Sequence, residues 1–213
     1  MNPSQIRFRP AERMTGLPKQ FFAQLTRKAA DAVRAGRDVI NLGQGNPDRP
    51  TPEHIVRAAQ EGAANPQFHR YAPFSGYMFL KEAVAERYRL DYGVELDPET
   101  QVAILFGGKT GLVEISQIML DPGDAALVPD PGYPDYWSGI ALAGGRMVMM
   151  PLTEDNGYLP DYGALRPEDL KRAKLMFFNY PNNPTSAMAP ESFYRDTVEF
   201  AAKHGILAVS DFA

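Results

Sequence analysis

The segment Gly107 to Gly111 has the composition of a phosphate-binding loop. Its glycines let the backbone approach an anion, and the helix expected after it would point the positive end of its dipole at that anion. A tight strand-to-helix turn without a ligand is the alternative. The end of a nucleoside-triphosphate loop, G-x-x-x-x-G-K-[ST], also matches this segment. Its first glycine would fall at Ala103, and residues 104–106 are expected in a strand, so this loop is not expected to wrap a triphosphate.

Three further groups could complete a site with this loop. Asp211 follows the apolar run 206–210, and a carboxylate there is costly to desolvate without a cationic partner. Tyr133 lies in a proline-rich turn and could stack on a planar ligand. The asparagines of 182–185 could bind a ligand or only their own backbone. A helix N-cap for Asp211 and an exposed turn position for Tyr133 are the structural alternatives.

The elements that must position these groups alternate along the second half of the chain. Apolar runs typical of buried strands alternate there with helical patterns. Strands are expected at 102–106, 125–128, 147–150, 175–178 and 206–209, and helices at about 111–120, 136–143, from 167, and 190–204. This order predicts an α/β fold with a largely parallel sheet. Ligands bind beyond the carboxyl ends of such strands, which is where the candidate groups are found.

The first hundred residues follow a different pattern. Apolar residues recur at helical spacing over 17–35, and a short strand is expected at 38–42. A second helix is expected to begin with Thr51 as N-cap and Pro52 at its first position, and a third to cover about 77–92. Residues 1–16 are expected to form an irregular N-terminal arm.

Composition and charge exclude several classes of function. The 213 residues carry a net charge of −4 and no cysteine, which excludes disulfides, thiolate metal sites and a cysteine nucleophile. A slightly acidic chain without a long basic run is a poor partner for nucleic acid or an anionic membrane. No apolar stretch reaches the roughly 18 residues of a membrane span, and the polar N-terminus is not a signal peptide. A soluble protein of the cytoplasm, without a metal, is therefore expected.

Six short motifs follow one another in a fixed order along the chain. They are Asn41 to Pro47, Tyr71 to Gly76, Phe106 to Gly111, Asp130 to Pro134, Asn179 to Thr185 and Ser210 to Ala213. In this order they resemble the class I and II aminotransferases of the pyridoxal-phosphate fold type I, and the resemblance covers essentially the entire chain. The sequence around 16–22 is most similar to Bacillus-type aminotransferases of methionine salvage.

The resemblance implies a fold and a reaction. The fold would be a three-layer α/β sandwich with a mostly parallel sheet. The reaction would be transfer of an amino group between an amino acid and a 2-oxo acid, with methionine and 4-methylthio-2-oxobutyrate, or another hydrophobic pair, as candidate substrates. The cofactor would be pyridoxal 5′-phosphate. Gly108, Lys109 and Thr110 would hold its phosphate, and Tyr133 would stack on its pyridine ring.

The remaining motifs receive roles from the same resemblance. Asn183 would hydrogen-bond the 3′ oxygen of the ring. Asp211 would pair with the ring nitrogen and keep it protonated, so that the ring can accept electrons. Gly45 is expected near the substrate carboxylate. Tyr71 is expected to reach the phosphate of a neighbouring subunit, which implies a homodimer.

The sequence departs from the family pattern in two respects. Ser186 stands where the family usually has glycine. The lysine that forms the Schiff base, the arginine for the substrate carboxylate and the C-terminal small domain are expected outside residues 1–213, so no catalytic residue is assigned in this chain. Residues 1–45 are expected to belong to the small-domain side, and 46–213 to an incomplete cofactor-binding large domain.

An aminotransferase fragment that is inactive alone is therefore the leading hypothesis. Lys109 is not expected to replace the missing lysine, because its motif places it at the phosphate. The alternatives are a nucleotide-phosphate-binding protein built on the Gly107 loop, and a non-catalytic fragment that serves only for dimerisation.

Overall fold

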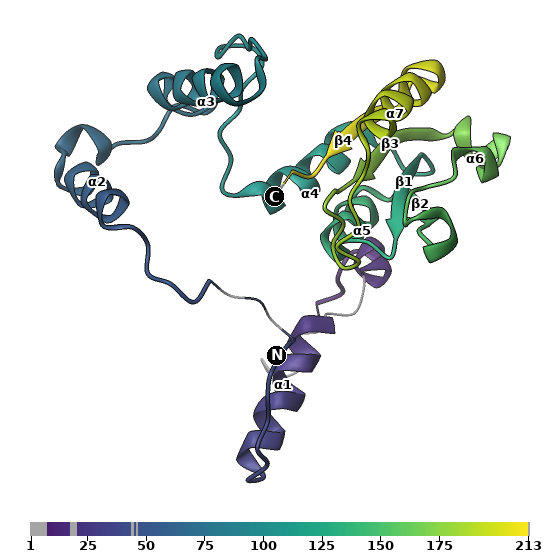
Figure 1. Cartoon of the computed structure of the whole chain (residues 1–213), viewed down its shortest axis with the longest axis horizontal. Coiled ribbons are helices and arrows are strands. Elements are labelled where there is room, and N and C mark those ends of the chain that lie inside the picture. Colours follow the sequence, from purple (N-terminus) through teal and green to yellow (C-terminus); the bar gives the residue numbers. More distant parts are fainter. Residues whose placement is uncertain (1–7, 18–20, 44, 46, 213) are drawn as a thin grey trace, which may run out of the picture. The chain divides into compact units, whose positions relative to one another are not determined.

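The computed structural model describes residues 8–17, 21–43, 45 and 47–212. The chain divides into two compact units, each shown in Figure 1. Met1–Pro18 and Gly107–Ala213 form the first, here called the sheet unit, and Lys19–Phe106 form the second, here called the helical unit. Parts of the sequence motifs, among them Gln44, Asn46 and Ala213, lie outside the described residues, as does the start of the expected arm.

The sheet unit is built on four parallel strands. They are β1 (Ala125–Asp130), β2 (Arg146–Pro151), β3 (Ala173–Phe178) and β4 (Leu207–Ser210). Their order across the sheet is β2-β1-β3-β4, and every pair is parallel. The carboxyl ends of the strands therefore share one edge of the sheet, where the candidate site residues follow them.

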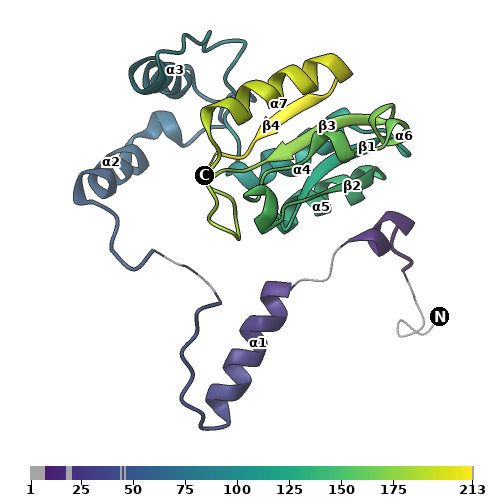
Figure 2. The same cartoon turned by 45° about the vertical axis from the view of Figure 1, so that its right-hand side comes forward.

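Helices cover both faces of this sheet (Figure 2). On one face lie α4 (Gly108–Met119) and α5 (Pro134–Ala143), and α7 (Glu191–His204) lies on the other with the short α6 (Pro167–Leu170). Proline at the first position of α5 needs no backbone acceptor, and left-handed glycines follow α5 and α7. The expected three-layer α/β fold is confirmed, with element boundaries within about three residues of those predicted.

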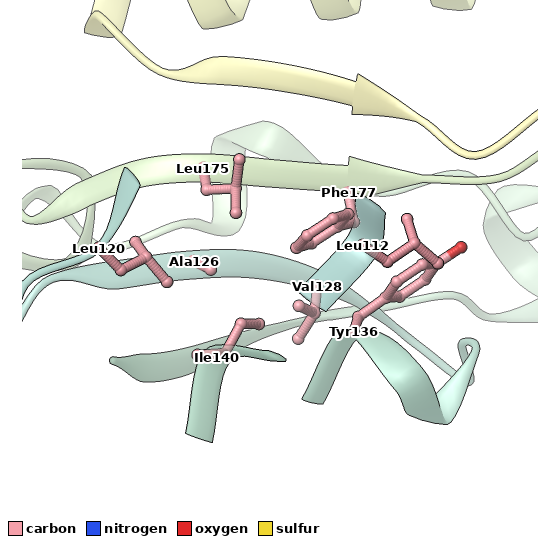
Figure 3. Packing of buried hydrophobic residues seen from close by; sticks show 8 residues of the cluster. All are labelled: Leu112, Leu120, Ala126, Val128, Tyr136, Ile140, Leu175 and Phe177. Carbon is pink, nitrogen blue, oxygen red and sulfur yellow. The ribbon is translucent and has the colours of Figure 1, made fainter. Parts of the chain in front are cut away.

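Alternation along β1 explains why its apolar run is continuous. Ala126 and Val128 face α4 and α5, while Ala125 and Leu127 face α7, and all four side chains are fully buried. Figure 3 shows the first of these two cores, in which the rings of Tyr136 and Phe177 lie side by side. Their centroids are 4.7 Å apart and their planes differ by only 6°. A strand buried on both faces holds the carboxyl edge of the sheet rigidly.

A close contact between helices occurs at Gly139 of α5. A Cβ atom there would lie 2.9 Å from the Oγ of Ser116 and from the Cα of Val113, both in α4. Only glycine lets the two helices approach this closely. The contact fixes the middle of α4 relative to α5, and residues of α4 and the N-cap of α5 line the site described below.

The helical unit contains α1 (Phe21–Arg34), α2 (Glu53–Ala64) and α3 (Met78–Tyr92). Among the residues of this unit whose burial is described, Lys81 of α3 is the buried one, at 2% exposure, and its ammonium donates to the carbonyl oxygen of Glu99 at 2.9 Å. The rings of Phe68, Tyr77 and Phe79 contact one another. Short 3-10 turns occur at Glu12–Gly16, Pro66–Phe68, Glu154–Asn156 and Tyr162–Ala164. The first of these gives part of the expected irregular arm a regular turn.

Two expected strands and one helix start are wrong. Residues 38–42 and 102–106 are not strands, and several of their apolar side chains remain exposed, with Leu42 at 89% and Phe106 at 101%. A strand needs a neighbouring strand. The N–H of Ile104 donates to the carbonyl oxygen of Ser75 at 3.4 Å, but neither run joins the sheet of the described residues. The second helix begins at Glu53, with Pro52 as its N-cap and no side-chain cap from Thr51. Pro52 has an extended ψ of 138°, and its carbonyl oxygen accepts from the N–H groups of Ile55 and Val56, so the helix begins one residue later than predicted.

Candidate active site

A pocket of about 480 Å³ lies at the carboxyl edge of the sheet. This volume suits a small cofactor or substrate. Residues from three loops and from the start of α4 line it: Gly108, Lys109, Leu112, Tyr133, Asn179, Pro181, Asn183, Asp211 and Phe212. Five of the predicted site residues, Gly108, Lys109, Tyr133, Asn183 and Asp211, are thus brought together.

The start of α4 offers backbone donors to this pocket. Gly107 precedes the helix with φ at 87°, a conformation that other residues rarely adopt, and provides no side-chain cap. The first N–H groups of a helix have no intrahelical acceptor, and they point along a dipole that favours an anion. Gly108 leaves open space around its Cα. This end of the pocket is therefore suited to a phosphate group.

Lys109 and Tyr133 lie together at the pocket wall. The Nζ of Lys109 is 3.0 Å from the Oδ2 of Asp135 and 5.4 Å from the centre of the Tyr133 ring. Hydrogen bonding with the side chains of Tyr133 and Asp135 raises the pKa of Lys109. Burial raises the pKa of the Tyr133 hydroxyl. The cation and the ring are held by two helices, because Lys109 is in α4 and Asp135 in the first turn of α5.

Asp211 extends the ladder between β3 and β4. Its N–H donates to the carbonyl oxygen of Phe178 at 2.9 Å, so the residue continues the strand pairing by one step. The hydroxyl of Tyr136 donates to its Oδ2 at 2.7 Å. Asp211 is half-buried at the pocket, and it caps no helix of the described chain. The carboxylate is therefore both fixed in position and accessible to a ligand.

Asn179 connects the two remaining loops of the site. Its side-chain amide donates to the carbonyl oxygen of Asp211 at 2.7 Å, and its Oδ1 accepts from the N–H of Asn183 at 2.9 Å. The residue is buried, with 6% of its surface exposed. Asn182 is also buried and accepts from the hydroxyl of Thr185 at 2.8 Å, which makes it a structural residue of the turn. The Asn183 side chain stays at the pocket.

Sequence reasoning missed two residues of the site. Tyr136 holds Asp211, and Asn179 joins Asp211 to Asn183. The sequence predicts for Tyr136 only a place at the start of a helix at about 136–143. The signal for Asn179 in the sequence is its place directly after the apolar run 175–178, where a polar amide needs hydrogen-bond partners.

Three predicted site residues do not line the pocket. Thr110 lies in the first turn of α4, beside the lining residues Gly108 and Lys109. Gly45 and Tyr71 belong to the helical unit, where both are exposed. Their expected roles at the substrate carboxylate and at a neighbouring subunit stay predictions.

Ser186 has a backbone conformation that favours glycine. Its φ is 60°, and its N–H donates to the carbonyl oxygen of Asn182 at 2.7 Å. We expect Ser186→Gly to raise the free energy of unfolding by about 0.5 kcal/mol, because relief of left-handed strain exceeds the entropy that glycine loses. Ser186→Val should lower it by about 1 kcal/mol, because branching at Cβ is disfavoured there. Urea unfolding measures both changes.

A matched control lies in α7. Ser192→Gly changes the same pair of residue types at an exposed helical position. It should lower the free energy of unfolding by up to about 1 kcal/mol, the opposite sign to Ser186→Gly. A loss of stability in Ser186→Gly would contradict the expectation of strain at this position.

Alkaline pH tests the contact between Tyr136 and Asp211. Burial, followed by the hydrogen bond with Asp211, raises the pKa of Tyr136. The unfolded chain loses this proton above about pH 10 while the folded chain keeps it, so stability is retained below pH 10 and falls above it by up to about 1.4 kcal/mol per pH unit. The free energy of unfolding of Tyr136→Phe, measured with urea, should therefore fall less steeply than that of the parent between about pH 10 and 11. Equal slopes in the two proteins would contradict this assignment.

The match of the chain to a family model identifies its class. Residues 37–213 match the model of aminotransferase class I and II, so the chain belongs to this family. Enzymes of the family use pyridoxal 5′-phosphate as cofactor. The family resemblance of the six motifs is thereby confirmed, and the nucleotide-binding alternative loses its support.

Curated and solved relatives agree with this assignment. The chain is 55% identical over 208 residues to an L-glutamine--4-(methylsulfanyl)-2-oxobutanoate aminotransferase and 52% identical over 204 residues to the transaminase BacF, both from Bacillus subtilis. These matches cover 98% and 96% of this chain but 52% and 51% of the relatives. The apo structure of BacF superposes with a TM-score of 0.89 at 50% identity, over 96% of this chain and 52% of that one. The chain thus spans about half the length of these relatives.

The donor set of the pocket fits pyridoxal 5′-phosphate. Helix N–H groups suit its phosphate, an aromatic side chain its ring, an amide its phenolic oxygen and a carboxylate its protonated nitrogen. Within the described residues, no three His, Asp or Glu side chains gather as a metal ion would need. No helix of the described part is long and apolar enough to cross a membrane.

Proposed function

We propose that the pocket binds pyridoxal 5′-phosphate and that the chain is the cofactor-holding part of an aminotransferase. The observation that carries this proposal is the convergence of Gly108, Tyr133, Asn183 and Asp211 on one pocket of suitable size. The substrate pair is an amino acid and a 2-oxo acid. Similarity to the glutamine and 4-(methylsulfanyl)-2-oxobutanoate enzyme favours a sulfur-containing or similarly apolar 2-oxo acid as acceptor.

Each side chain has a separate task at the cofactor. The N–H groups at the start of α4 bind the phosphate, with Thr110 beside them. Tyr133 stacks on the ring, and Asn183 donates to the phenolic oxygen. Asp211, held by Tyr136 and Asn179, keeps a proton on the ring nitrogen. When bound, the cofactor supplies an electron sink for removal of a substrate proton.

The same proposal extends to assembly and reactivity. A homodimer in which Tyr71 reaches the phosphate of the neighbouring subunit follows from the family resemblance, as do Gly45 at the substrate carboxylate and a cytoplasmic location. The lysine among the residues lining the pocket, Lys109, is paired with Asp135. We therefore propose that residues 1–213 bind the cofactor without a covalent bond and do not transaminate alone.

Titration with pyridoxal 5′-phosphate tests this function. Trp137, the single tryptophan of the chain, is in α5 next to Tyr136, and the bound cofactor should quench its fluorescence in a saturable manner. Borohydride treatment followed by intact mass measurement should leave the protein mass unchanged. Absence of saturable quenching would overturn cofactor binding, and magnesium-dependent ATP binding at the same pocket would favour the nucleotide alternative.

An activity assay tests the second half of the proposal. The purified chain is incubated with methionine or glutamine and 2-oxo acids, and new amino acids are measured. No turnover is expected from residues 1–213. Turnover above the background of free cofactor would contradict the assignment of catalysis to groups outside this chain. Sedimentation of the same sample measures the proposed dimer.

A further inference from the structure

Lys109 is the cation of the pocket wall, and its geometry separates two roles. Its Nζ lies 3.0 Å from a carboxylate oxygen of Asp135 and 5.4 Å from the ring centre of Tyr133. The side chain of Lys109 is 73% exposed and that of Asp135 is 32% exposed. A lysine that acts only as a phosphate ligand would have no need of a carboxylate partner, because that partner weakens its attraction for an anion.

The carboxylate of Asp135 belongs to the same turn as the ring. Tyr133 is the N-cap of α5 and Asp135 its second residue, so the two share one turn of backbone. Lys109 comes from the first turn of α4. An ion pair between these helices therefore fixes the loop that carries the ring, and the cation attracts the ring face.

We propose that Lys109 is a positioning residue for Tyr133. Together with Asp135 it forms a latch that holds the ring at the pocket, while the backbone N–H groups of α4 bind the phosphate. This inference rests on the proposed cofactor site and refines it. It differs from the family-based expectation, in which Lys109 belongs to the phosphate-binding group.

Two ligands distinguish the latch from a phosphate contact. Pyridoxal has the ring of the cofactor but no phosphate, and inorganic phosphate has no ring. Loss of a ring-positioning residue should lower the affinity for pyridoxal. Loss of a phosphate ligand should lower only the affinities for pyridoxal 5′-phosphate and inorganic phosphate. The variants are Lys109→Gln, Asp135→Asn and the double variant. Lys174→Gln and Asp155→Asn, at exposed positions away from the pocket lining, remove the same charges as controls.

The expected results follow from the pairing. Each single variant should lower the affinity for pyridoxal by about threefold to tenfold, which is the contribution expected of an exposed ion pair with a cation–π contact. The double variant should be no weaker than the single ones, because the latch is already lost. Asp135→Asn should leave the affinity for inorganic phosphate unchanged or increase it, since Lys109 is released. Quenching of Trp137 by pyridoxal, and competition by phosphate, measure these affinities.

Other outcomes would overturn the latch. Unchanged pyridoxal affinity in Lys109→Gln, with weaker pyridoxal 5′-phosphate, would make Lys109 a simple phosphate ligand. If the losses of pyridoxal affinity in the two single variants added up in the double variant, Lys109 and Asp135 would act independently and not as one latch. If the parent chain bound neither ligand, the proposed function would fail. The contact of Lys109 and Asp135 with Tyr133 would then be tested in the protein without ligand, by NMR. Both single variants should shift the NMR signals of the Tyr133 ring in the same direction, and unmoved signals would then refute the latch.

Discussion

Replacing Asp211 by asparagine should weaken the binding of pyridoxal 5′-phosphate at least tenfold, about 1.4 kcal/mol. A carboxylate pairs with a protonated ring nitrogen, and a neutral amide of the same shape does not. The fold should remain, because the backbone N–H of residue 211 still bonds Phe178 and its oxygen can still accept from Tyr136. Quenching of Trp137 measures the affinity, and the absorbance of the bound cofactor reports the protonation of its ring.

Two measurements show whether the effect of Asp211→Asn is specific to the cofactor ring. Competition by inorganic phosphate should be unchanged in Asp211→Asn, because the phosphate binds at the start of α4. Asp155→Asn, in an exposed 3-10 turn, should have the affinity of the parent. Equal cofactor affinity in Asp211→Asn and the parent would remove Asp211 from the cofactor site.

Replacing Phe177 by alanine should lower the free energy of unfolding by about 3 to 5 kcal/mol. The ring is fully buried in the core of β1, β3, α4 and α5, and it stacks on Tyr136 at 4.7 Å. Its removal leaves a cavity beside Tyr136. The hydroxyl of Tyr136 would then lose its fixed position at Asp211, so cofactor binding should weaken as well. Urea unfolding, followed by Trp137 fluorescence, measures the stability.

Two variants separate the cavity from other effects. Phe177→Leu fills most of the space and should lose less than Phe177→Ala. Val198→Ala removes an apolar side chain that is 61% exposed on α7, and it should change stability by less than about 0.5 kcal/mol. A loss below 1 kcal/mol in Phe177→Ala would show that this core is not what holds the site together.

The sheet unit could be predicted because its pattern is local. Runs such as 125–128 and 175–178 are apolar throughout, which is typical of strands buried on both faces, and their loops contain the polar residues that converge at one edge. Five predicted site residues line the pocket for this reason. Because the strands are parallel, the motifs that follow them in the sequence meet at one edge of the sheet and form one site.

The two wrong strands and the contacts that were not predicted depend on more distant parts of the chain. The runs 38–42 and 102–106 have strand composition, but a strand forms only when another segment supplies hydrogen bonds, and no composition shows whether that segment is available. The bond of Tyr136 to Asp211 depends on how α5 packs on the sheet. The pairing of Lys109 with Asp135 depends on how α4 meets α5, which are in close contact at Gly139. Such contacts between helices follow from packing and not from spacing along the chain.

The single hydrogen bond from the N–H of Asp211 to Phe178 has a dynamic consequence. The backbone of Asp211 is the next step of the β3–β4 ladder, so fraying of β4 would also displace the carboxylate from its bond with Tyr136. Amide hydrogen exchange at residues 208–211 would therefore report the integrity of the site directly. A ligand that bridges Asp211 and α4 should slow this exchange, and the same amides would show how often the site is open without it.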